Sequence, residues 1–142
     1  MATHTDQKLE LLKHVPLLSE LGGREIQEVG RLAEEIDVAS GKVLMREGDI
    51  GQEFYVIVDG TVRIDRGGKT VRTLTSGDFF GEIALVDGGP RTATATTESP
   101  SKLLVVGHRE FNSLMDAYPS IQSCVFRALG SRIRSLEPDA AH

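Results

Sequence analysis

The residues best suited to binding chemistry gather in one stretch, residues 79–94, which reads FFGEIALVDGGPRTAT. In this stretch Glu82 stands nine positions before Arg91, with a Gly-Gly-Pro turn between them. Gly81 has no Cβ, so a ligand can come close to its backbone. A helical turn that starts at Glu82 would point free N–H groups at an anion. Arg91 offers a guanidinium fork for phosphate oxygens, and the Glu82 carboxylate, which only accepts hydrogen bonds, suits a sugar hydroxyl. The spacing therefore predicts a site for a small phosphorylated sugar ring.

The spacing of apolar residues predicts the elements that position this stretch. Within residues 23–35, apolar residues recur at three- and four-residue intervals, which predicts an amphipathic helix. From Asp37 onward apolar residues alternate with polar ones between frequent glycines, as in half-buried strands, and Gly67-Gly68 predicts a hairpin turn. Further helices are predicted over 108–115 and from 118 onward. This order predicts an α+β fold, an antiparallel β-roll (jelly-roll-like) flanked by N-terminal and C-terminal helices.

Composition narrows the classes of partner. The chain has 142 residues, which suits a single domain with a full core. Its net charge of −5 argues against a nucleic-acid surface and against anionic lipid, although a local arginine still allows a small anionic ligand. Cys124 is the only cysteine, so no internal disulfide can form. The polar N-terminus and the lack of a long apolar run fit a cytoplasmic protein, which we expect this to be.

The stretch resembles the phosphate-binding cassette of cyclic-nucleotide-binding domains, the family of the catabolite activator protein and the protein kinase A regulatory subunits. The family pattern, F-G-E-[LI]-A-L followed by P-R-[TAS]-A, is matched by Phe80-Gly81-Glu82-Ile83-Ala84-Leu85 and Pro90-Arg91-Thr92-Ala93. Three earlier segments resemble the turns and strands that precede the cassette in this family: Glu47-Gly48-Asp49, Phe54-Tyr55-Val56-Ile57 and Gly60-Thr61-Val62. The resemblance covers about residues 10–136 of a single domain, 1–142. Few residues follow the last helix, so we expect no helix-turn-helix and no DNA binding by this chain alone.

The resemblance implies roles for the cassette residues. Glu82 should accept a hydrogen bond from the ribose 2′-hydroxyl, and Arg91 should pair with the cyclic phosphate inside the roll. Gly81 and Ala84 should contribute backbone contacts near phosphate and ribose, while Ile83 should line the sugar. Without the pattern, a solvated first-turn glutamate and a surface salt bridge would be the ordinary interpretations of Glu82 and Arg91.

The resemblance says less about the base. It places Ile64 and Val71 beside the purine, although either residue could simply belong to the core. Leu136 falls where the catabolite-activator group has a polar residue that touches adenine. Leu136 cannot make that contact, so a cap over the base is apolar or comes from Arg132 or Arg134. Thr92 is compatible with cAMP and also with cGMP, since its hydroxyl can meet the guanine 2-amino group; bacterial members of the family favour cAMP.

These observations favour a sensor of cyclic nucleotide, most simply cAMP, whose C-terminal helix closes over the base. The output would pass through a homodimer formed by that helix or through another protein; the helix could equally pack only on its own roll. Alternatives are a cGMP-binding domain and a ligand-free interaction module. An enzyme is not expected: the four histidines do not cluster as metal ligands, and neither a P-loop nor a serine elbow is present.

Overall fold

The computed structural model describes residues 4–13, 18, 21–81, 90–123, 126–127 and 130. The chain divides into two compact units, one formed by Met1–Gly30 with Ser113–His142 and the other by Arg31–Asn112. The second unit is the β-roll, and each unit is described by itself below.

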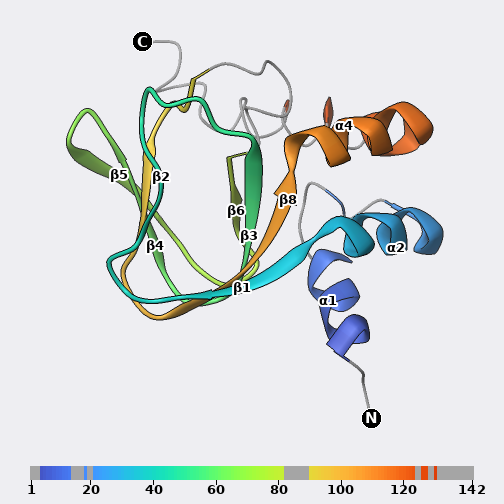
Figure 1. Ribbon diagram of the computed structural model, residues 1–142, viewed down its shortest axis with the longest axis horizontal. Helices are drawn as coiled ribbons and strands as arrows, with labels where there is room; N and C mark the ends of the chain where they lie inside the picture. The colour runs from blue at the N-terminus through green and yellow to red at the C-terminus, as the bar shows by residue number, and fades with distance from the viewer. Residues whose placement is uncertain are drawn as a thin grey trace. The chain divides into compact units, whose positions relative to one another are not determined.

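The roll consists of two four-stranded antiparallel sheets among the described residues (Figure 1). The first sheet has the order β1-β8-β3-β6 and the second β2-β7-β4-β5. Their bounds are β1 Glu34–Val38, β2 Val43–Met45, β3 Glu53–Asp59, β4 Val62–Arg66, β5 Lys69–Leu74, β6 Phe79–Phe80, β7 Thr94–Thr97 and β8 Ser101–Gly107. Strands β6 and β7 flank the segment that holds the cassette, so one end of that segment joins each sheet. The predicted α+β roll is confirmed.

Strand β3 explains how the core forms. Successive side chains of a strand point to opposite faces. Tyr55 and Ile57 lie on one face, in a buried cluster with residues of both sheets: Val62, Leu74, Phe80, Ala95 and Leu103. Phe54 lies on the other face, where its ring meets Phe111 edge to face at 5.3 Å between centroids. Both faces of the strand are buried, and this accounts for its continuous apolar run.

The β4–β5 hairpin confirms the predicted turn and adds a bulge. Gly67 and Gly68 both have positive φ, 60° and 80°, as a two-residue hairpin turn of type I′ requires. Ile64 pairs with Arg72, but the next residue of β4 pairs with Thr70, so Val71 has no partner across the ladder. A bulge of this kind re-aims side chains on the bulged strand.

The other unit is helical. Helix α1 spans His4–Lys13, and α2, Gly23–Leu32, begins there and ends just inside the roll unit. Lys8 Nζ donates a hydrogen bond to the Gly30 carbonyl at 2.9 Å, which ties α1 to α2. Helix α4, His108–Ala117, begins in the roll unit, enters the helical unit at Ser113 and ends two residues beyond its predicted end; residues 119–123 are again helical.

The predicted end of the helix over 23–35 is wrong. Helix α2 ends at Leu32, and residues 34–38 form β1 instead. Glu34 pairs with Val105 and Ile36 with Leu103 of β8. The hydrogen bonds to β8 decide the conformation here, because local spacing is a weaker determinant than a sheet ladder.

Candidate functional site

The structure describes five of the predicted site residues, namely Gly81, Arg91, Thr92, Ile64 and Val71. Glu82, Ile83, Ala84 and Leu136 lie outside the described residues, so their roles stay predictions.

The backbone of Arg91 is held by the turn after β2. Its N–H donates to the Asp49 carbonyl at 2.8 Å, and its own carbonyl accepts from the Gly48 N–H at 2.8 Å. The preceding residue, Pro90, forms an isolated bridge with Ile50. The Glu47-Gly48-Asp49 turn, which carried part of the resemblance, therefore fixes the arginine from a distance of more than forty positions along the chain.

The guanidinium of Arg91 is directed inward. Its side chain is 6% exposed. Nη2 donates to the Glu53 carbonyl at 2.7 Å and Nη1 to the Gly81 carbonyl at 3.2 Å. The ordinary interpretation, a surface salt bridge, is therefore wrong for Arg91.

Two glycines make room for this guanidinium. A Cβ on Gly51 would stand 1.8 Å from Nε of Arg91, and a Cβ on Gly81 would stand 2.9 Å from Nη1 and 3.0 Å from the Glu53 carbonyl oxygen. Gly81 also has φ of +86°, a conformation that L side chains rarely adopt. Gly81 thus serves both the backbone geometry and the close approach of Arg91, and its predicted contact with a ligand stays a prediction.

The positive charge of Arg91 lacks a carboxylate partner among the described residues. No oxygen of a described acidic side chain forms an ion pair with it, and its two acceptors are neutral carbonyls. Its Nε is buried and has no hydrogen-bond partner in the described part of the chain. A buried donor of this kind is unusual, because buried polar groups are nearly always bonded. The site can therefore accept an anion that supplies the missing charge and acceptor.

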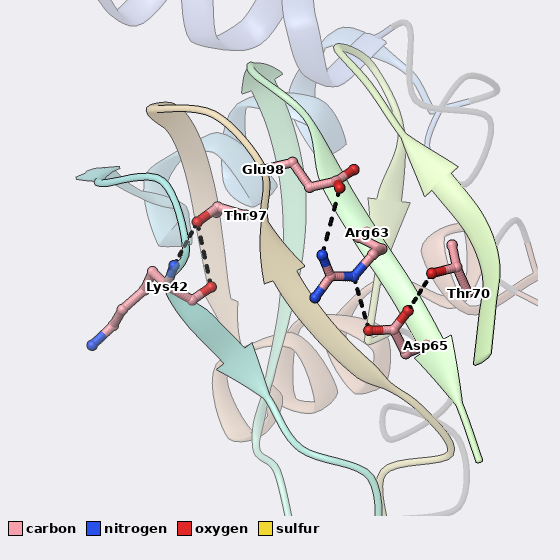
Figure 2. A network of polar contacts seen from close by, with 6 residues as sticks. All are labelled: Lys42, Arg63, Asp65, Thr70, Thr97 and Glu98. Carbon is pink, nitrogen blue, oxygen red and sulfur yellow. Dashed lines mark hydrogen bonds and ion pairs between the residues drawn. The ribbon is translucent and has the colours of Figure 1, made fainter. Parts of the chain in front are cut away.

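Arg63 provides the contrast (Figure 2). It alternates with the core-facing residues of β4 and so lies on the opposite face of that strand. Its Nε contacts Asp65 at 2.9 Å and its Nη1 contacts Glu98 at 3.5 Å. Hydrogen bonds from Arg63 and from Thr70 hold the pKa of Asp65 below its usual range. The Arg63 charge therefore has carboxylate partners within the folded chain and requires no ligand as its counter-charge.

The sequence analysis did not identify the contact between Glu53 and Tyr55. The Tyr55 hydroxyl lies 3.2 Å from Oε2 of Glu53 and 3.3 Å from the Leu44 carbonyl. Its ring stacks on Phe80, with 4.8 Å between centroids. Burial, reinforced by the Glu53 carboxylate, raises the pKa of Tyr55 to about 12, and the charge of Arg91 opposes the shift. The two-residue spacing of 53 and 55 on one strand was the available signal.

The residues predicted near the base have different surroundings. Ile64 is half-buried and packs against the roll core. Val71, at the bulge, is 55% exposed, so the alternative that it is a core residue does not hold. Thr92 is exposed, and its carbonyl accepts from Nε of Arg66 at 3.2 Å. Val71 and Thr92 thus have side chains free to meet a ligand.

The described residues also bear on two other kinds of site. No group of three or more His, Cys, Asp or Glu side chains in that part of the chain could hold a metal ion. None of the described helices is long and apolar enough to cross a membrane.

Comparison with known proteins agrees with this geometry. Residues 35–118 match the family model described as the cyclic nucleotide-binding domain. A cAMP-dependent protein kinase regulatory subunit from Schizosaccharomyces pombe is 38% identical over 106 residues, which is 74% of this chain. The chain spans only 26% to 30% of the length of three such regulatory subunits.

Solved structures show the same fold. The Thermus thermophilus catabolite activator protein matches with a TM-score of 0.80 and 27% identity, over 89% of this chain and 62% of that one. The N-terminal domain of a transcriptional regulator from Streptomyces coelicolor matches with a TM-score of 0.76 and 30% identity, over 90% and 95% of the two chains.

Proposed function

The chain belongs to the cyclic nucleotide-binding domain family, and on this premise we propose that it binds cAMP through Arg91 and acts as a regulatory domain, not as an enzyme. The observation that supports the proposal is the state of Arg91: buried, held by two neutral carbonyls and left with a free Nε among the described residues. A cyclic phosphate carries one negative charge and exocyclic oxygens, which complement this guanidinium.

The other cassette residues complete the proposed site. The Glu82 carboxylate accepts a hydrogen bond from the ribose 2′-hydroxyl. Gly81 and Ala84 offer backbone contacts near the phosphate and ribose, and Ile83 lines the sugar. These assignments rest on the match of residues 80–85 and 90–93 to the family pattern. The positive φ of Gly81, which glycine adopts without steric cost, and its place beside Nη1 of Arg91 support a close approach of backbone to phosphate.

We propose cAMP over cGMP because the regulatory subunits that this chain resembles are named for cAMP. Val71, exposed on the bulge of β5, and Ile64, on the neighbouring strand β4, support a purine position along the β4–β5 hairpin. Thr92 supports cGMP as the second candidate, since its side chain is exposed next to Arg91. One neutral hydrogen bond contributes about 0.5–1.5 kcal/mol, so Thr92 would alter preference by roughly 2- to 12-fold and no more.

The regulatory part of the proposal concerns the C-terminal helix. Nucleotide binding would shift the population toward a state in which this helix, including Leu136, covers the base. The helical residue Phe126 is 51% exposed, which supports a further contact, with the base, a second copy or another protein. A homodimer through this helix and a separate protein partner are both compatible with that exposure.

Calorimetric titration tests the proposal directly. The protein is unfolded and refolded to remove any carried ligand, then titrated with cAMP and with cGMP. Micromolar or tighter binding of cAMP, abolished or strongly weakened by Arg91→Ala, is the expected result. Absence of both heat and a thermal shift with either nucleotide would refute it and favour an interaction module, and tighter binding of cGMP would reverse the choice of base.

A further inference from the structure

We infer that Glu53 makes this site selective for singly charged cyclic phosphates over doubly charged open-chain phosphates. The inference rests on the proposed function and concerns a residue outside the phosphate-binding cassette. It follows from the position of the Glu53 carboxylate relative to Arg91 and Tyr55.

Glu53 belongs to the same face of β3 as the roll core. Tyr55 and Ile57 are members of the core cluster, and Glu53 precedes Tyr55 by two positions, so its side chain leaves the strand on that face. Its own carbonyl accepts the 2.7 Å hydrogen bond from Nη2 of Arg91. The backbone carbonyl of Glu53 therefore contacts the arginine proposed to bind phosphate, while its carboxylate contacts Tyr55, a member of the roll core.

The carboxylate is held in place without neutralising the arginine. The Tyr55 hydroxyl donates to Oε2 at 3.2 Å, and the Tyr55 ring is fixed by its stack on Phe80, the residue before Gly81. No ion pair joins Glu53 to Arg91 in the described structure. The anion site thus has a fixed negative charge close by, whose effect on a ligand is repulsive.

The carboxylate is also accessible to solvent. Glu53 is exposed and borders an open pocket of about 350 Å³, lined further by Gln52, Gly107, His108, Arg109 and Glu110. Its charge therefore stands in partly hydrated surroundings, where charge–charge interactions are moderate.

Repulsion from one fixed charge grows with the charge of the ligand. A cyclic phosphate diester carries one negative charge at any pH near neutrality, whereas an open monophosphate carries about 1.5 to 2, with a second pKa of about 6. Arg91 attracts both, so only the difference between proteins with and without the Glu53 charge isolates its effect. For one added charge at a separation of one Debye length, about 8 Å at physiological salt, and an effective dielectric of roughly 20–80, Coulomb's law gives a penalty of about 2- to 30-fold in affinity.

The test compares cAMP with 5′-AMP in Glu53→Gln. Competition against a fluorescent cyclic nucleotide gives the affinity ratio of AMP to cAMP at pH 7.5 and pH 5.0. We expect this ratio to rise about 2- to 30-fold in the variant at pH 7.5. The rise should shrink at pH 5.0, where AMP is mostly singly charged. Tyr55→Phe keeps the ring but releases the carboxylate, and should raise the ratio by a smaller factor.

Asp59→Asn is the matched control. Asp59 is exposed at the other end of β3, six residues away or about 20 Å along a strand, and its replacement changes net charge by the same amount. Its ratio should equal that of the unchanged protein. An equal rise in the control would overturn the inference, because net charge alone would then explain it. An unchanged ratio in Glu53→Gln, with normal cAMP binding by the parent, overturns the inference and leaves the proposed function. No binding of either nucleotide by the parent overturns both.

Discussion

Replacement of Arg91 by alanine is the perturbation whose outcome the structure constrains best. The substitution removes a guanidinium that is 6% exposed and that donates to the carbonyls of Glu53 and Gly81. A truncated buried member of a charged pair weakens binding by about 2–5 kcal/mol, because the ligand charge loses its partner in a desolvated place. Converted to affinity, this is about 30-fold to several-thousand-fold weaker cAMP binding.

Arg63→Ala is the control for this experiment, since it removes the same charge from the same roll. Arg63 is more exposed, 37% by its side chain, and its partners Asp65 and Glu98 lie on the face away from the core. Screened pairs of this kind contribute little. We therefore expect cAMP affinity within about twofold of the parent, so the two arginines should differ by an order of magnitude or more.

Isothermal titration of the refolded proteins measures both effects, and circular dichroism checks that each variant is folded. In Arg91→Ala the carbonyls of Glu53 and Gly81 lose their hydrogen bonds from Arg91. A buried acceptor left unsatisfied lowers the free energy of unfolding by about 1–3 kcal/mol, so we expect a lower midpoint of urea unfolding. The affinity is compared only at urea-free conditions where the variant is native. A loss below about fivefold in folded Arg91→Ala would refute the argument from burial, because it is what a surface bridge would give.

Three further outcomes follow from the same geometry. Gly81→Ala should weaken cAMP binding and destabilise the fold by about 1–2 kcal/mol, because φ is left-handed and the new Cβ would lie 2.9 Å from Nη1 of Arg91 and 3.0 Å from the Glu53 carbonyl oxygen. Gly23→Ala, where a Cβ meets open space, should change neither; titrations and thermal melts measure both effects. The pKa of Tyr55 is raised to about 12, so the contribution of this tyrosine to the stability of the fold is complete below pH 10 and is lost as the pH rises from 10 to 12. Urea unfolding followed across that range should show the loss in the parent and not in Tyr55→Phe. Thr92→Ala should lower cGMP affinity by roughly 2- to 12-fold and leave cAMP affinity unchanged, and an equal loss for both nucleotides in calorimetry would exclude a contact with the base.

Residue spacing predicted the parts of the site that are local in the chain. Gly81 and Arg91, ten positions apart, were identified from the sequence as site residues, and the structure places them in contact, which the sequence had not predicted. The hairpin at Gly67-Gly68 was equally local, because positive φ at both positions depends on the two residues themselves. The assignments of Glu82, Ile83, Ala84 and Leu136 remain predictions.

Features that depend on strand pairing could not be predicted. The bond from Arg91 to the Glu53 carbonyl spans 38 positions and exists because residues 48–49 hold the arginine backbone beside β3. The bulge at Val71 depends on the register between β4 and β5, which alternation alone does not specify. The helix over 23–35 was extended too far for the same reason, since the pairing of β1 with β8 involves residues about seventy positions apart.

The contrast between the two arginines also bears on why the domain should respond to its ligand. Arg63 has its counter-charges in the folded chain, so nothing in its environment changes when a small anion arrives. Arg91 is buried and, among the described residues, donates only to two neutral carbonyls, so its charge gains a counter-charge when an anion binds. An anion that binds the folded domain but not the unfolded chain would stabilise the domain by RT ln(1 + [L]/Kd). On the proposed function, such a site would suit a switch, because a bound nucleotide supplies the counter-charge that the described residues lack.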